Sequence, residues 1–174
     1  MLIPLTAATT EPVTLAEAKA HLRMIHAADD ALITRQIRAA REHVELTTGV
    51  ALATATYRLT EYSFQNPFVI PFAPVATVSA VSYLDASGVR VVVAPAEYRF
   101  DADRVSVAPV ASWPSWATSV NVDFTTAPGL IPEALKSAIL LRVQAEYEAE
   151  PDDAQKLREA AHLVAWPFRR NLGV

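Results

Sequence analysis

Charged residues are distributed unevenly along the sequence, and this distribution constrains the fold most strongly. Ten of the 36 residues in 14–49 and eleven of the 28 in 132–159 are charged, but only ten of the 77 in 51–127. Apolar residues recur at helical spacing in the outer stretches and alternate with polar residues in the middle one. We therefore expect an α+β fold, with a small α-helical core and an inserted antiparallel β-sheet or sandwich.

The first charged stretch predicts a helical hairpin. Thr14 and Glu17 have the spacing of a capping box, and Gly49 suits the left-handed residue that ends a helix. Between the two helices, Asp29 or Asp30 is expected to cap the second one. The two apolar stripes are expected to be Leu15, Ala18, Leu22 and Ile25, followed by Ile33, Ile37, Ala40 and Val44.

The last charged stretch predicts two more helices. Pro132 fits the first turn of one, and Pro151 ends it. Asp152 or Asp153 is expected to cap the next helix, which runs to Pro167. The inward-facing residues are expected to be Leu135, Ile139, Val143 and Tyr147, and then Leu157, Ala161 and Val164.

The middle stretch predicts strands and hairpins. Residues 56–62 alternate as a strand does, and hairpin turns are expected around 85–88 and 101–103. The chain is thus expected to divide into an N-terminal extension, a helical hairpin, a β-insertion, C-terminal helices that complete the helical core, and an interaction tail. The bounds of these parts are 1–13, 14–50, 51–130, 131–165 and 166–174.

Composition argues against several classes of function. The formal net charge is −4, whereas an open, non-specific nucleic-acid binder normally has a basic balance. The sequence has no cysteine, which rules out disulfides, thiolate metal sites and cysteine nucleophiles. It has no phosphate-binding loop, dinucleotide fingerprint, nucleophile elbow or zinc-protease motif. We therefore expect no enzyme activity, no catalytic residue, no metal and no cofactor.

Two weaker chemical signals have plainer structural explanations. His21 and His26 are five positions apart, so they do not share a helical face as metal ligands at i and i+4 do. Asp101 and Asp103 alternate as calcium ligands can, but a calcium site needs about six or more oxygens, and turn formation is the favoured role. The N-terminus lacks a basic segment and Pro4 interrupts its apolar run, which disfavours a signal peptide and indicates a cytoplasmic protein.

Arginines on the second predicted helix allow two interpretations. Arg35, Arg38 and Arg41 step by three and could form a basic ridge near DNA phosphates or a neighbouring subunit. Alternatively, Arg38 with Glu42 and Arg41 with Glu45 form ion pairs at i, i+4 spacing on a solvated face, and this interpretation is favoured.

Aromatic residues mark two candidate interfaces. Trp113 and Trp116 lie in a loop of the β-region, where they either form an interface or cover the sheet of their own chain. After the stop at Pro167, the chain ends with two aromatic and two basic side chains, which are expected to bind the portal or a neighbouring chain. These residues are Trp166, Phe168, Arg169 and Arg170. The alternative is that Trp166 and Phe168 fold back over the chain's own helices.

Several stretches together resemble head–tail connector (adaptor) proteins of long-tailed phages and gene transfer agents. The entry motif, Pro-Val-Thr-Leu-Ala-Glu-Ala-Lys-Ala-His-Leu, spans 12–22. It is followed by Asp-Asp-Ala-Leu-Ile at 29–33 and by a helix end with Val-Glu-Leu-Thr-Thr-Gly within 40–49. An apolar-proline strand with a hairpin at 70–88, and a closing strand with a long helix at 122–148, are also similar to that family.

The resemblance implies an architectural role without catalysis. Such adaptors form a ring, typically twelve-fold, beneath the portal protein, extend the DNA channel for packaged DNA, and contact the next tail component, a stopper or terminator-type protein. The chain would then be part of the neck of a phage-like particle. The additional helix and the Trp-Pro-Phe-Arg-Arg ending resemble the gene-transfer-agent type more than the phage type. The alternative function is a DNA-binding accessory protein that uses the arginine ridge.

Overall fold

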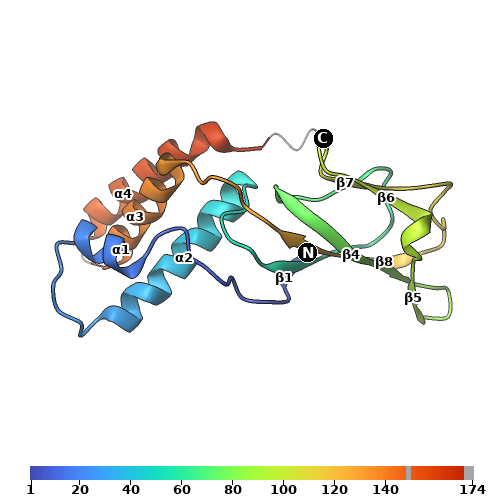
Figure 1. Ribbon diagram of the computed structural model, residues 1–174, viewed down its shortest axis with the longest axis horizontal. Coiled ribbons are helices and arrows are strands. Elements are labelled where there is room, and N and C mark those ends of the chain that lie inside the picture. The colour runs from blue at the N-terminus through green and yellow to red at the C-terminus, as the bar shows by residue number, and fades with distance from the viewer. Residues whose placement is uncertain (148–149, 171–174) are drawn as a thin grey trace. The chain divides into compact units, whose positions relative to one another are not determined.

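The computed structural model describes residues 1–147 and 150–170 (Figure 1). The chain forms two compact units. A β unit contains Met1–Thr9 and Ala53–Pro128, and a helical unit contains Thr10–Leu52 and the described part of Gly129–Asn171. Helices from both ends of the sequence therefore share one unit, and the strands are inserted between them. This arrangement confirms the predicted α+β fold.

The β unit contains two antiparallel sheets. The five-stranded sheet has the order β1-β2-β8-β4-β5, with bounds Leu2–Pro4, Thr56–Glu61, Thr118–Thr126, Val75–Leu84 and Arg90–Val92. The three-stranded sheet has the order β3-β7-β6, with bounds Phe68–Val69, Ser106–Pro109 and Tyr98–Asp101, and a 3-10 turn, Pro95–Glu97, precedes β6.

Both sheets contribute to a single apolar core. Val122 and Phe124 of β8 are buried together with Tyr57 of β2, whose ring stacks on Phe124 with centroids 5.8 Å apart. Phe68 of β3 and Val107 of β7 belong to the same cluster. The alternation of apolar and polar residues in the sequence therefore places one face of each sheet in this core.

The two predicted hairpins are present, and aspartates shape their turns. Asp85 accepts hydrogen bonds from the N–H groups of Ser87 and Val89, both at 2.8 Å, between β4 and β5. Asp101 accepts from the N–H groups of Asp103 and Arg104, both at 3.0 Å, between β6 and β7. The expected turn role of Asp101 is therefore confirmed.

The sequence predicts an extension at the N-terminus, but part of this segment forms a strand of the β unit. Strand β1 lies at the edge of the five-stranded sheet, where Leu2 is opposite Leu59 and Pro4 is opposite Tyr57. A proline is tolerated in an edge strand because the missing N–H faces outward. Residues 2–4 were not recognised as a strand because the segment is short and its pairing partner lies more than 50 residues away.

The helical unit contains α1 (Leu15–His21), α2 (Asp30–Thr48), α3 (Glu133–Tyr147) and α4 (Pro151–Ala165). Helix α3 packs against α2 and α4, and these helices lie side by side in Figure 1. Their core includes the predicted stripes of α2 and α3, of which Tyr147 is only partly buried. Its buried residues include Ile33, Ile37, Ala40, Val44, Leu135, Ile139, Val143 and Ala161. No helix in residues 1–147 and 150–170 is long and apolar enough to cross a membrane.

The capping residues behave partly as predicted. Thr14 and Glu17 form the complete capping box, and the hydrogen bonds from Thr14 lower the pKa of Glu17. Gly49 has the expected left-handed conformation after α2, with φ of 71°. Asp29 occupies the N-cap position, but its carboxylate accepts a hydrogen bond from the hydroxyl of Tyr147 at 2.7 Å instead of capping.

Two local predictions were wrong. Ile25 is 97% exposed because α1 ends at His21 and Arg23 adopts a positive φ of 58°, which takes the chain off the helical path. The N-cap of α4 is Glu150, so Asp152 and Asp153 lie in the first turn, where carboxylates favour the positive end of the helix dipole.

The capping box predicts a measurable contribution to stability. Replacing Thr14 by alanine removes the side-chain acceptor for the N–H of Glu17 and should lower the free energy of unfolding by about 1 kcal/mol. Urea denaturation followed by circular dichroism measures this loss. Thr47→Ala is the matched control, because the hydroxyl of Thr47 only contacts carbonyls within α2. Equal losses in the two variants would contradict the assigned role of the box.

Candidate functional site

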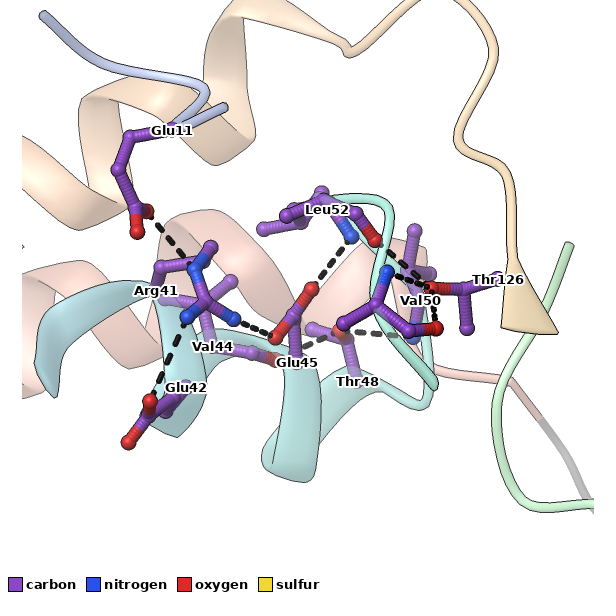
Figure 2. A network of polar contacts seen from close by, with 11 residues as sticks. Glu11, Arg41, Glu42, Val44, Glu45, Thr48, Val50, Leu52 and Thr126 are labelled. Atoms are coloured by element: carbon purple, nitrogen blue, oxygen red, sulfur yellow. Dashed lines mark hydrogen bonds and ion pairs between the residues drawn. The ribbon is translucent and has the colours of Figure 1, made fainter. Parts of the chain in front are cut away.

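A buried ion pair organises the end of α2 (Figure 2). Arg41 and Glu45 are only 3% and 1% exposed, and the guanidinium donates a short hydrogen bond to the carboxylate one helical turn later. Arg41 also donates from Nε to Glu11 at 2.8 Å, and its Nη2 lies 3.4 Å from Glu42. Buried charges require such complete pairing, because removal from water is costly for each ion.

The second carboxylate oxygen of Glu45 holds the segment that follows the helix. It accepts a hydrogen bond from the N–H of Leu52 at 2.7 Å, after the chain has turned at Gly49. Thr48 assists, since its hydroxyl donates to the carbonyl of Val44 and accepts from the N–H of Val50. The pair of Arg41 and Glu45 therefore links the helix to the entry segment through Glu11 and to the exit segment through Leu52, all within the helical unit.

The network separates Arg41 from the other two arginines of the predicted ridge, because only Arg41 is buried. The pairing of Arg41 with Glu45 is confirmed, and Arg41 is buried, so it cannot belong to a surface that contacts DNA. Arg35 and Arg38 are exposed on α2. Among the described residues, no ion pair joins Arg38 to Glu42, whose carboxylate lies near Arg41 instead. The ridge thus contains two arginines rather than three, which weakens the DNA-binding interpretation.

The C-terminal segment folds partly onto its own chain. After α4 it forms a 3-10 turn, η2 (Trp166–Phe168), and Phe168 packs against the core of the helical unit. The backbone N–H of Arg170 then donates to the carbonyl of Thr48 at 2.8 Å. The alternative interpretation, in which the aromatic residues fold back over the chain's own helices, is therefore observed for Phe168. The last part of the predicted tail, 171–174, lies outside the described residues.

Trp166 remains at the surface, unlike Phe168. Its side chain is 52% exposed, and the Arg169 guanidinium lies over its ring at 5.0 Å from the centroid. The ring of His162 from α4 is 5.3 Å away. Arg170 is partly buried, its Nη1 has no hydrogen-bond partner among the described residues, and burial lowers its pKa. The segment therefore presents an aromatic ring and two cations with little compensation from acidic groups.

The two loop tryptophans have different environments. Trp113 stacks on Phe64 with ring centroids 4.2 Å apart, and its Nε1 donates to the carbonyl of Gln65 at 3.0 Å. It therefore covers the core of its own unit. Trp116 touches the edge of Tyr83 but is 55% exposed. Of the two, Trp116 is the residue available to a partner.

The described residues offer no obvious catalytic or metal centre. Within 1–147 and 150–170, no group of three or more His, Cys, Asp or Glu side chains could hold a metal ion. His21 lies 3.0 Å from Gln144, a contact between α1 and α3 rather than a ligand set.

Sequence reasoning missed the role of Glu11 and the full extent of the Arg41 network. Glu11 is 30 positions away from Arg41, so no local periodicity connects them. The i, i+4 spacing of Arg41 and Glu45 predicted the pair, but the expected solvated position was wrong, because spacing alone does not distinguish a buried pair from an exposed one.

The network predicts a large stability effect from one charge. Glu45→Gln keeps the shape and an acceptor for the N–H of Leu52 but removes the negative charge facing Arg41, and it should cost about 3 kcal/mol. Glu42→Gln, at an exposed carboxylate, should cost less than about 1 kcal/mol. Chemical denaturation measures both changes. A loss for Glu45→Gln no larger than that of its control would show that the pair does not organise the helix end.

Comparisons with known proteins agree with this description. The family model for phage gp6-like head–tail connector proteins matches residues 12–84. A chain in the virion of a native gene transfer agent particle is 29% identical, with a TM-score of 0.71 over 100% of this chain and 98% of that chain. No curated protein matches the chain.

Two structures of the neck of the gene transfer agent particle are similarly close. A chain in the neck of the empty particle, computed with C6 symmetry, is 26% identical with a TM-score of 0.73. One in the neck of the native particle, computed with C12 symmetry, is 28% identical with a TM-score of 0.70. Each match covers 100% of this chain and 98% of the other. Residues 12–84 thus match the family of gp6-like head–tail connector proteins, and the whole chain is similar to chains of gene transfer agent particles.

Proposed function

We propose that this chain is one subunit of a ring in the neck of a phage-like or gene-transfer-agent particle, where it joins the head to the tail. The observation that carries the proposal is the full-length similarity to chains from particle necks, one of them computed with C12 symmetry. That similarity supports a twelve-fold ring. The subunit acts as an architectural part without catalysis, and it is assembled in the cytoplasm before it enters the particle.

The ring has two faces in this proposal. One face docks on the portal protein, the other receives the next tail component, and packaged DNA passes through the lumen. A closed ring requires different surfaces on the two sides of each subunit, because every copy contacts its neighbours head to tail. The two-unit architecture supplies chemically different surfaces for this purpose, one helical and one made of strands.

The segment that begins at Trp166 is the proposed portal- or neighbour-binding element. Its support is the half-exposed tryptophan and the Arg169 side chain lying over it. Arg170 adds a partly buried cation whose Nη1 has no hydrogen-bond partner in the part of the chain that the structure describes. Tryptophan and arginine contribute most strongly to interface energies when a partner covers them. Acidic groups on the partner would supply the acceptors that Arg170 lacks among the described residues.

A variant of the full-length chain tests the proposed binding element. Replacing Trp166 and Arg169 by serine removes the exposed ring and its cation but leaves Phe168 on the helical core. Capture by the portal protein of the same particle should weaken at least about 30-fold, as expected for the loss of about 2 kcal/mol at a hot spot.

Leu163→Ser provides the matched control, because Leu163 is exposed on α4 outside the segment. It should retain portal binding close to that of the unmodified chain. Undiminished capture of the Trp166 and Arg169 variant would show that the portal protein binds a different surface of the chain. Failure of the unmodified chain to bind the portal at all would contradict the connector proposal itself.

A further inference from the structure

A recess lies between α2 and α3 within the helical unit. It has a volume of about 370 Å³. Helix α2 lines it with Arg35, Gln36, Ala39 and Ala40, and α3 lines it with Arg142 and Glu146. The alanines form an apolar wall beside polar groups. A recess of this size and lining can accept one side chain and a short piece of backbone.

Arg142 is the unusual residue of the recess. Its Nε is buried without a hydrogen-bond acceptor, and no ion pair to Arg142 is present among the described residues. The carboxylate of Glu146, on the same wall, is held by Arg158 at 3.0 Å. Burial lowers the pKa of Arg142, the charge of Glu146 partly opposes that shift, and Arg158 adds to it. A partly buried cation without an ion-pair partner is stabilised when an anion arrives.

The surroundings of Arg142 are positive overall. His43, on α2, has its pKa lowered by burial and then by the charges of Arg142 and His162. Arg35 and Arg142 both line the recess and carry positive charges. Since Arg158 neutralises Glu146, the recess carries excess positive charge in a chain whose formal net charge is −4.

Gln36 indicates what kind of anion fits. Its Nε2 donates to the carbonyl of Glu146 at 2.9 Å, which sets the orientation of the amide. Its Oε1 is buried and has no donor among the described residues. The recess therefore requires both an anionic acceptor and an N–H donor. A peptide segment with a carboxylate side chain supplies both, whereas a DNA phosphodiester supplies acceptors only.

We propose that this recess binds an acidic peptide segment of a neighbouring protein. The Asp or Glu carboxylate of that segment pairs with Arg142 and Arg35, and one of its N–H groups donates to Gln36. Arg142 Nε and Gln36 Oε1 are covered in the free chain, so the segment reaches them by rotating both side chains, and this rotation breaks the contact of Gln36 with the carbonyl of Glu146. The site is separate from the segment around Trp166, and it deepens the connector proposal by adding a second contact to a neighbour.

The direct test uses nuclear magnetic resonance on the full-length chain. The probe is a triglutamate peptide with acetyl and amide ends, and the comparison probes are the matching triglutamine peptide and a short DNA duplex. The Nε–H signal of Arg142 should move with triglutamate at about millimolar concentration at low salt, and the shift should shrink at high salt. If the Nε–H signal of Arg142 also moves when the concentration of the chain is raised without any peptide, the proposal is supported and the neighbouring protein is a second copy of this chain.

Variants then localise the binding. Arg142→Gln should weaken triglutamate binding about tenfold or more, and Arg142→Lys, which keeps the charge but loses the planar fork, should be intermediate. Arg38→Gln is the matched control on α2, outside the recess, and should stay within about twofold of the unmodified chain.

Three results would overturn the proposal. These are a stationary Arg142 signal with triglutamate, an equal response to triglutamine, and a response to the DNA duplex in place of the peptide. None of them bears on portal capture through the segment around Trp166, so the connector proposal can stand or fail separately.

Discussion

The buried contact between Arg41 and Glu45 determines the geometry on which the rest of the helical unit depends. Glu45 accepts from the helix residue one turn earlier and from the backbone N–H of Leu52, beyond the turn at Gly49. Arg41 in turn holds Glu11, at the start of the same unit. One ion pair therefore fixes where α2 ends, how the chain leaves it and where the entry segment lies. The charges are tolerated inside because each has several partners.

The arginines differ in whether an acidic group of the same chain pairs with them, and this difference indicates which of them can bind a partner protein. Arg41 is fully committed to acidic neighbours, whereas Arg142 and Arg170 are partly buried with nitrogen atoms that lack acceptors among the described residues. Burial lowers the pKa of both of these arginines. A subunit that assembles with other chains benefits from such groups, because a partner's acidic side chain gains a charge-assisted hydrogen bond at little additional desolvation cost.

The sequence predicted the features that depend on local spacing. The apolar stripes of α2 and α3, the capping box at Thr14, the left-handed Gly49 and the turn at Asp101 follow from residues within a few positions of one another. The family resemblance could also be recognised from short stretches in order, and the match at 12–84 confirms it.

Features that depend on contacts between residues far apart in the sequence could not be predicted from local spacing. Asp29 meets Tyr147 from 118 positions away, and that contact replaces the expected cap. Strand β1 is visible only through its pairing with β2, and the recess appears only when α2 and α3 are placed together. The spacing of Arg35, Arg38 and Arg41 suggested one ridge because periodicity cannot distinguish a buried ion pair from an exposed charge.

Electron cryo-microscopy of a particle that contains this chain tests the central claim most directly. The account predicts a closed ring of copies in the neck, between the head and the tail, with the segment around Trp166 in contact with another chain. Density for the chain at any other position in the particle, or a particle with a complete neck that lacks it, would contradict the account.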